Sequence, residues 1–147
     1  MYISPRIRIL ATIKTGSVYY FQDEELSSAD SHYFVVLNKD PRTEEFLILV
    51  CASSQIEKRR HIIQKLGFPQ ETLVFVSPVH YKIFRKDTVI DCNRVFEKTS
   101  ASLIEKLEQD KLRVCSEMMP ESIIKSLIQG VLASNQISEK VKRMLLS

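Results

Sequence analysis

The order of apolar and polar residues along this chain predicts a sheet in the first two-thirds and helices in the last third. Two apolar runs rich in β-branched and aromatic residues, 33–37 and 46–51, flank a polar link. This pattern is typical of a β-hairpin whose strands are buried on both faces. Shorter runs at 18–21, 72–76 and 88–91 predict single strands. We therefore expect about five strands in all.

The hairpin determines which side chains meet at its open end. If the link closes antiparallel, Leu37 lies opposite Leu47. Continuing that register brings His32 alongside Ala52 and Ser53. A titratable imidazole is therefore expected beside serine hydroxyls.

Helix start signals precede several of the remaining apolar segments. Residues 4–5, a serine followed by proline, can open a short N-terminal helix, with a strand as the alternative. Ser54 matches the first position of a capping box and predicts a helix that ends at Gly67. Ser102 begins a second capping box and predicts a helix of its own.

The last third of the chain carries two broad apolar helix faces. The first follows Pro120 and comprises residues 123–131, and the second comprises residues 137–145. The first face either covers the sheet or forms a contact with a partner or a second copy of the chain. Strands followed by helices indicate a small α+β domain.

Length and composition indicate one domain that spans residues 1–147. A chain of 147 residues can bury a core without metal or disulfide support, and 44% apolar and 27% charged residues exclude disorder and membrane spanning. Three dispersed cysteines without a Cys-x-x-Cys pair favour a reducing compartment. We therefore expect a soluble, cytoplasmic protein. Its net charge of +3 permits nucleic-acid binding where cations cluster.

Candidate chemistry gathers at the open end of the predicted hairpin. His32, Ser53 and Ser54 meet there, and a basic helix begins beside them with Lys58 and Arg59. These groups beside a helix N-terminus suit a phosphodiester. Metal-free RNA cleavage needs a base for the ribose 2′-hydroxyl, an acid for the leaving oxygen and cations for the phosphorane charge. The imidazole can serve as base or acid, either serine as a donor to the phosphate, and Lys58 with Arg59 as the cations.

Two basic clusters are candidates for RNA binding. Their members are Arg59, Arg60, Lys82, Arg85 and Lys86. The second cluster lies near aromatic residues, a composition suited to stacking and backbone contacts with a single strand. Each candidate also has a purely structural interpretation. The serine can be a helix cap, the histidine a boundary residue and the cations a solvated surface.

No metal or cofactor is expected. Cys51 and Cys92 lie in apolar runs without basic neighbours, so neither is expected to be a thiolate nucleophile. Asp91 and Asn93 fit a turn in which their side chains bond the local backbone. Zinc-ligand spacing, a phosphate-binding glycine loop and a dinucleotide fingerprint are absent from the sequence.

The order of the predicted segments resembles the PemK/MazF-like toxin superfamily. The segments that carry the resemblance are 16–21, 33–37, 49–54, 72–76 and 88–91, followed by a helix at 102–107. They cover residues 16–107 and leave residues 119–147 as a C-terminal helical extension. The resemblance implies a small SH3-like antiparallel β-barrel with an inserted helix and C-terminal helices, which is an α+β fold.

The resemblance also implies a function. Members of this superfamily include toxin-type, metal-independent endoribonucleases that act on single-stranded RNA and belong to toxin–antitoxin or phage-defence systems. We therefore expect an RNA substrate, a cognate antitoxin and a homodimer, with no membrane partner. The alternative is a non-catalytic PemK/MazF-like module that mediates protein or nucleic-acid interactions.

Two departures from the family pattern favour that alternative. Val76, Ser77 and Pro78 occupy the strand end where many members place an arginine that stabilises charge on the phosphate. The acidic residues 23–25 replace a proline-rich loop that shapes the RNA groove in typical members. Their carboxylates are expected to repel RNA.

Overall fold

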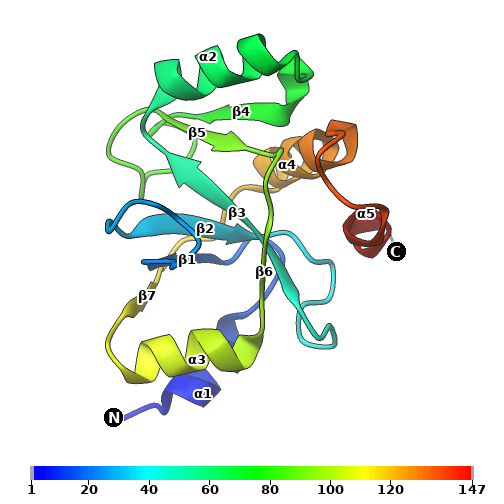
Figure 1. The fold of residues 1–147 in the computed structure, drawn as a ribbon. Helices are drawn as coiled ribbons and strands as arrows, with labels where there is room; N and C mark the ends of the chain where they lie inside the picture. The colour runs from blue at the N-terminus through cyan, green and yellow to red at the C-terminus, as the bar shows by residue number, and fades with distance from the viewer. Residues whose placement is uncertain (1, 147) are drawn as a thin grey trace.

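Within residues 2–146, seven strands form one antiparallel sheet, and five α-helices surround it (Figure 1). The computed structural model describes residues 2–146. The elements in chain order are α1 (Pro5–Thr12), β1 (Val18–Phe21), β2 (His32–Val36), β3 (Leu47–Ser53), α2 (Ile56–Leu66), the 3-10 turn η1 (Gln70–Thr72), β4 (Leu73–Val76), β5 (Thr88–Asp91), β6 (Phe96–Lys98), α3 (Ser100–Glu108), β7 (Leu112–Val114), α4 (Glu121–Ala133) and α5 (Glu139–Leu146). This is the expected α+β class. Within residues 2–146, no helix has both the length and the apolar character that crossing a bilayer requires.

The sheet is open, and β3 is its longest strand. The order is β4-β5-β3-β2-β1-β7, and β6 also pairs with β3. The edge strands β4 and β7 are not paired with each other, so the expected barrel is not closed in the described residues. β3 pairs with β2 only as far as Cys51, and its last residues Ala52 and Ser53 pair with β5 instead. The strands β2 and β3 therefore part at this point.

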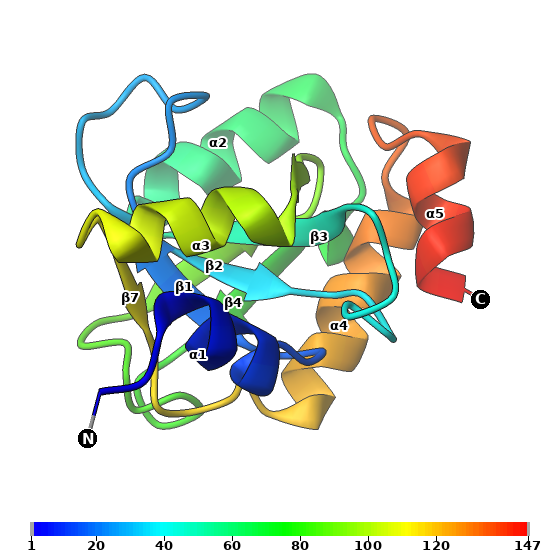
Figure 2. The same cartoon turned by 90° about the horizontal axis from the view of Figure 1, so that it is seen from below.

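Each face of the sheet has its own core because neighbouring residues in a strand point to opposite faces. Val35 and Leu37 pack in the core that α4 and α5 cover, whereas Phe34 and Val36 pack in the core that α1 and α3 cover. Figure 2 shows α1 and α3 in front of the sheet with α4 and α5 to one side. The expectation that the hairpin strands are buried on both faces is confirmed.

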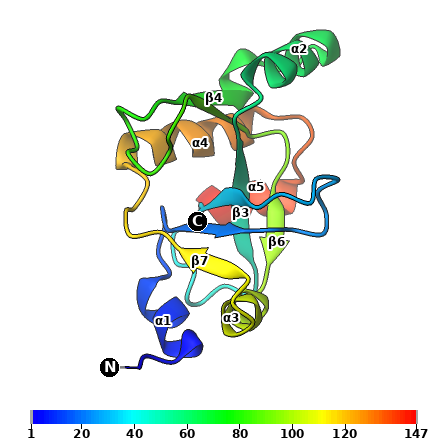
Figure 3. The same ribbon diagram turned by 90° about the vertical axis from the view of Figure 1, so that its left-hand side faces the viewer.

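A third, smaller core lies beneath α2. Ile63 of this helix packs against Leu73 of β4 and Val89 of β5. Figure 3 shows α2 at one end of the molecule and α1 with α3 at the other, with β3 running between them. β3 therefore connects the part of the sheet that α2 covers to the part that α1 and α3 cover.

The predicted hairpin register is wrong by one residue. The structure pairs Phe34 with Cys51, and the Leu37 amide donates to the Ile48 carbonyl at 2.9 Å, so Leu37 does not face Leu47. The cause is the buried Asn38 at the end of the polar link. Its Nδ2 donates to the Phe46 carbonyl (3.0 Å) and its Oδ1 accepts from the Ile48 amide (2.6 Å). This side chain takes the place of backbone groups and moves the pairing by one position.

The predicted N-terminal helix is confirmed, but both capping boxes are wrong. The Ser4 hydroxyl accepts from the Ile7 amide at 3.2 Å and caps α1. α2 has Gln55, not Ser54, at its N-cap, and no side chain bonds there. α3 begins two residues before Ser102, because the Thr99 hydroxyl is its cap. A serine three residues before a glutamate therefore indicated the helix but not its first residue.

The sequence did not predict β6 and β7, and it left open whether the apolar face of α4 covers the sheet or contacts a partner. β6 and β7 contain three residues each, too few to show a period of two. They pair with β3 and β1 and complete the sheet. On α4, the apolar residues Ile124, Leu127 and Val131 are buried in the core with β-strand residues. That part of the helix face therefore covers the sheet.

Candidate functional site

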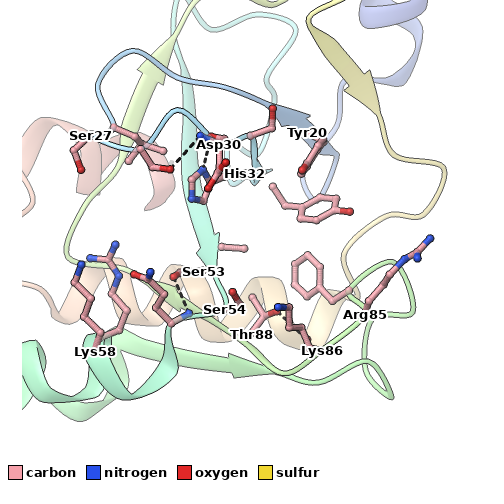
Figure 4. Close-up of a pocket in the computed structure, with 18 residues that line it drawn as sticks. Tyr20, Ser27, Asp30, His32, Ser53, Ser54, Lys58, Arg85, Lys86 and Thr88 are labelled. Atoms are coloured by element: carbon pink, nitrogen blue, oxygen red, sulfur yellow. Dashed lines mark hydrogen bonds between the residues drawn. The ribbon is translucent and has the colours of Figure 1, made fainter.

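A pocket of about 490 Å³ opens where β2 and β3 part (Figure 4). Four separate segments supply its walls: β1, the loop before β2 with the start of β2, the end of β3 with the start of α2, and the loop before β5. The lining residues are Tyr20, Leu26, Ser27, Ser28, Asp30, Ser31, His32, Tyr33, Ala52, Ser53, Ser54, Gln55, Lys58, Arg59, Phe84, Arg85, Lys86 and Thr88. Its volume lies within the range of small-ligand sites, about 300–1,000 Å³.

The pocket contains most of the residues that the sequence singled out as candidates. These are His32, Ser53, Ser54, Lys58, Arg59, Arg85 and Lys86. Figure 4 shows His32 on one wall and Ser53 with Lys58 on the opposite one. The structure therefore places the imidazole, the hydroxyls and cations from both basic clusters around one space.

Two candidates, Arg60 and Lys82, do not line the pocket. Arg60 Nη1 lies 2.6 Å from Glu57 Oε1, and its guanidinium is 5.3 Å from the centroid of the Phe75 ring. Lys82 Nζ lies 2.9 Å from Glu117 Oε1. Both cations are therefore engaged elsewhere on the surface, as the alternative of a solvated charged face expects.

The imidazole of His32 is oriented by a backbone carbonyl. Its Nδ1 lies 3.0 Å from the carbonyl oxygen of Asp30. A carbonyl oxygen can only accept, so Nδ1 carries the hydrogen of this bond. In the neutral ring Nε2 then keeps a free lone pair. His32 is thus held in the tautomer that can take a proton at Nε2.

The two serines play different roles at the start of α2. Ser53 Oγ accepts from the Gln55 amide at 3.1 Å, which leaves its own hydrogen available for a ligand. Ser54 is exposed and caps nothing, so the interpretation of Ser54 as a helix cap alone is wrong. Because no side chain caps α2, its first amides point out of the helix without an internal partner, a favourable environment for an anion.

The charge of the pocket is strongly positive. Lys58, Arg59, Arg85 and Lys86 line it, and Asp30 supplies the one carboxylate among its lining residues. Within the described chain, none of these four cations has a carboxylate oxygen within 4.0 Å. Unpaired cations that share one cavity favour an anionic ligand.

The acidic residues 23–25 lie outside the lining of the pocket. Lys98 Nζ lies 2.6 Å from Asp23 Oδ1 and 2.8 Å from Glu25 Oε2. Lys106 Nζ lies 3.6 Å from Glu24 Oε2, and nearby cations contribute to lowering the pKa of this carboxyl, after a local backbone hydrogen bond. Two lysines therefore offset part of the charge of the three carboxylates, and the repulsion of RNA by this loop stays a prediction.

Aromatic residues that the sequence reasoning missed form the floor of the pocket. The ring centroids of Tyr20 and Tyr33 are 4.5 Å apart, and those of Tyr33 and Phe84 are 5.2 Å apart. Both tyrosines are partly exposed, whereas their neighbours Tyr19 and Phe34 are fully buried. The signal was present in the strands, because tyrosine at paired positions of two strands is suited to a surface that is apolar on one side and wet on the other.

The cysteines lie outside the pocket. Burial raises the pKa of the Cys51 and Cys92 thiols to about 12, so both remain protonated at neutral pH. Within residues 2–146, no group of three or more histidine, cysteine, aspartate and glutamate side chains is arranged to hold a metal ion.

The sequence matches no protein-family model and no curated protein.

Proposed function

We propose that this protein is a metal-independent endoribonuclease of the PemK/MazF-like type that acts on single-stranded RNA. One observation supports the proposal most: an oriented imidazole, a free serine hydroxyl and four unpaired cations from distant segments line one pocket with an aromatic floor. We also propose that the sheet is an opened form of the SH3-like barrel over residues 16–107.

The proposed reaction is an internal transesterification. His32 Nε2 takes the proton of a ribose 2′-hydroxyl, and the 2′-oxygen forms a bond to the adjacent phosphorus. The bond from phosphorus to the 5′-oxygen breaks, and that oxygen takes a proton from the Lys58 ammonium. The products are a 2′,3′-cyclic phosphate and a 5′-hydroxyl. The Arg59 guanidinium and the Ser53 hydroxyl bond the phosphorane oxygens, where negative charge develops.

The aromatic floor and the second basic cluster fit the rest of an RNA ligand. Tyr20 and Tyr33 are partly exposed and offer ring surfaces on which an unpaired base can stack, and the buried Phe84 packs against Tyr33. Arg85 and Lys86 line the pocket from the loop before β5 and can bond the flanking phosphates. Arg59 and Arg85 would supply the charge that many family members place at the strand end occupied here by residues 76–78.

Cleavage of a labelled, unstructured RNA of mixed sequence in the presence of EDTA tests the proposal. We expect fragments that end in a cyclic phosphate, and we expect His32→Gln to slow cleavage by about 10²–10⁴-fold. The affinity of His32→Gln for the same RNA carrying 2′-O-methyl groups should stay within about twofold of wild type, because this residue acts on a proton more than on phosphate charge. His80→Gln is the matched control and should cleave normally, since His80 lies outside the pocket. Fragments that persist unchanged in His32→Gln would contradict the proposed site.

A second candidate function is RNA binding without cleavage. The observation that favours it is that His32 is the one imidazole among the lining residues, so the acid must be a lysine. A binder predicts an affinity that falls steeply with salt and an RNA that stays intact. The same assay separates the two functions, because it reports affinity and fragments together.

RNA cleavage of this kind would give the protein a role as a toxin in the cell. We propose that the protein acts as a toxin, forms a homodimer and is neutralised by a cognate antitoxin. Induction of the wild-type chain should arrest growth and fragment cellular RNA, whereas induction of His32→Gln should do neither. Arrest with intact RNA would point to the binding function.

A further inference from the structure

A second hollow of about 740 Å³ adjoins the pocket and is lined mainly by charged side chains. Its lining residues are Arg8, Tyr20, Gln22, Glu24, Ser31, Lys106, Leu107, Asp110, Lys111, Leu112 and Arg113. Tyr20 and Ser31 line both hollows. The two hollows therefore lie next to each other, with Tyr20 and Ser31 at the boundary between them.

The boundary between the two hollows is built from stacked groups. The Arg113 guanidinium lies 4.6 Å from the centroid of the Tyr20 ring, and its Nη2 donates to the Tyr33 hydroxyl at 3.3 Å. Tyr20 in turn contacts Tyr33, which belongs to the floor of the first pocket. Arg113 thus holds the boundary in place while its charge faces the second hollow.

The second hollow also has a surplus of cations. Lys106 is balanced by Glu24 at 3.6 Å. Among the described residues, Arg8, Lys111 and Arg113 have no carboxylate oxygen within 4.0 Å. Arg8 comes from α1, whereas Lys111 and Arg113 lie in and directly before β7, so folding brings Arg8 to two cations that are far from it in the sequence. A strip of unpaired cations that continues a nucleic-acid pocket is suited to the phosphates of the same strand.

We propose that the second hollow is an extension of the RNA site that binds the phosphates of nucleotides flanking the one in the pocket, through Arg8, Lys111 and Arg113. This inference rests on the proposed binding of single-stranded RNA. It adds that the substrate is a strand several nucleotides long, which runs from the pocket over Tyr20 toward α1. It also adds that affinity rises with strand length.

Binding of labelled, non-cleavable 2′-O-methyl oligouridines tests the extension. We compare a trinucleotide with a dodecanucleotide by fluorescence anisotropy at about 0.1 M salt, where each lost phosphate contact lowers the affinity for a single strand about fivefold. Wild type should prefer the longer strand. Arg8→Ala/Lys111→Ala should weaken the longer strand about 25-fold and the trinucleotide less than about twofold. The control Lys125→Ala/Lys140→Ala removes two exposed charges from α4 and α5 and should leave both affinities unchanged.

Each other result has a distinct meaning. If wild type binds both oligonucleotides equally, or if the control pair weakens the longer strand as much as the test pair does, the extension is refuted while the pocket stands. If the test pair weakens the trinucleotide as much as the longer strand, the two residues act on the pocket itself and the extension is again refuted. If wild type binds neither oligonucleotide, the proposed RNA-binding function fails as well.

Discussion

At the scale of single residues, neighbouring arginines on α2 are directed to different surroundings. Arg59 lines the pocket without a carboxylate partner, whereas Arg60 is paired with Glu57 and lies over Phe75. A helix turns by about 100° per residue, so adjacent positions face different directions. The sequence placed both arginines in one basic cluster, because a run of like residues does not reveal which member faces a ligand.

Because the two arginines have different surroundings, replacing each with alanine should change the affinity for RNA by different amounts. Arg59→Ala should lower the affinity for single-stranded RNA about fivefold at about 0.1 M salt, because it removes one phosphate contact. Arg60→Ala should change the affinity less than about twofold, apart from a small uniform effect of net charge. Anisotropy titrations of the two variants at several salt concentrations check this. Equal losses in both would show that the cluster acts only through its total charge.

Lys98 is the residue that holds the acidic loop against the sheet. Its side chain is 10% exposed and contacts Asp23, whose side chain is fully buried. Removing the cation leaves a buried carboxylate without its partner, so Lys98→Met should lower the free energy of unfolding by about 3–5 kcal/mol. Urea titration measures this loss. Lys125→Met, which breaks an exposed pair with Glu121, is the control and should cost less than about 1 kcal/mol.

The ion pair between Lys98 and Asp23 also predicts how the stabilities of wild type and Lys98→Met differ at alkaline pH. Burial lowers the pKa of Lys98, but the hydrogen bonds to Asp23 and Glu25 outweigh it and raise the pKa above the ordinary 10.5. The stabilisation is therefore fully present below 10.5 and is lost as the pH rises through the higher folded value. The stability gap between wild type and Lys98→Met should shrink above that pH. A gap that stays constant would exclude the charge as its source.

At the scale of elements, α4 approaches η1 and the turn after β5 closely at a glycine. A Cβ added to Gly130 would lie 2.7 Å from the Glu71 carbonyl oxygen and 2.8 Å from Cys92 Sγ. Alanine gains about 1 kcal/mol of helix propensity over glycine, but overpacking costs about 1–3 kcal/mol. Because backbone forms one side of the contact, we expect Gly130→Ala to destabilise the protein by about 1–2 kcal/mol.

Thermal or urea unfolding checks this expectation against Ser126→Ala, an exposed substitution on the same helix that should change stability by less than about 0.5 kcal/mol. If Gly130→Ala is more stable than wild type, the gain in helix propensity exceeds the cost of overpacking, and α4 can move outward.

The elements that could be predicted from the sequence are those with long periodic patterns. Strands β1 to β5 and the helix that follows Pro120 appear where the apolar runs placed them. The register of β2 against β3 could not be predicted, because it depends on the side chain of Asn38 replacing backbone groups. The three-residue strands β6 and β7 were missed because they form through long-range pairing and carry no local period.

At the scale of the whole molecule, the candidate site exists only when distant segments come together. The sequence identified His32, the serines and the cations by their chemical types. It did not identify the floor of Tyr20, Tyr33 and Phe84, because aromatic residues in apolar runs are usually core residues. Nor could it predict that Lys98 and Lys106 would offset part of the charge of the acidic loop, since these lysines lie about seventy to eighty positions away along the chain.

The pocket between β2 and β3 has a floor and a rim that differ in how well they tolerate substitution. Tyr20 and Tyr33 belong to strands whose other residues form the cores, and Phe84 is itself a core residue, so changes to the floor carry a cost in stability. The rim at residues 27–30 is exposed and belongs to none of the three cores. Loops of this kind accept substitution and insertion readily. Ligand preference in this architecture can therefore diverge, or be engineered by loop exchange, without a compensating change in the sheet.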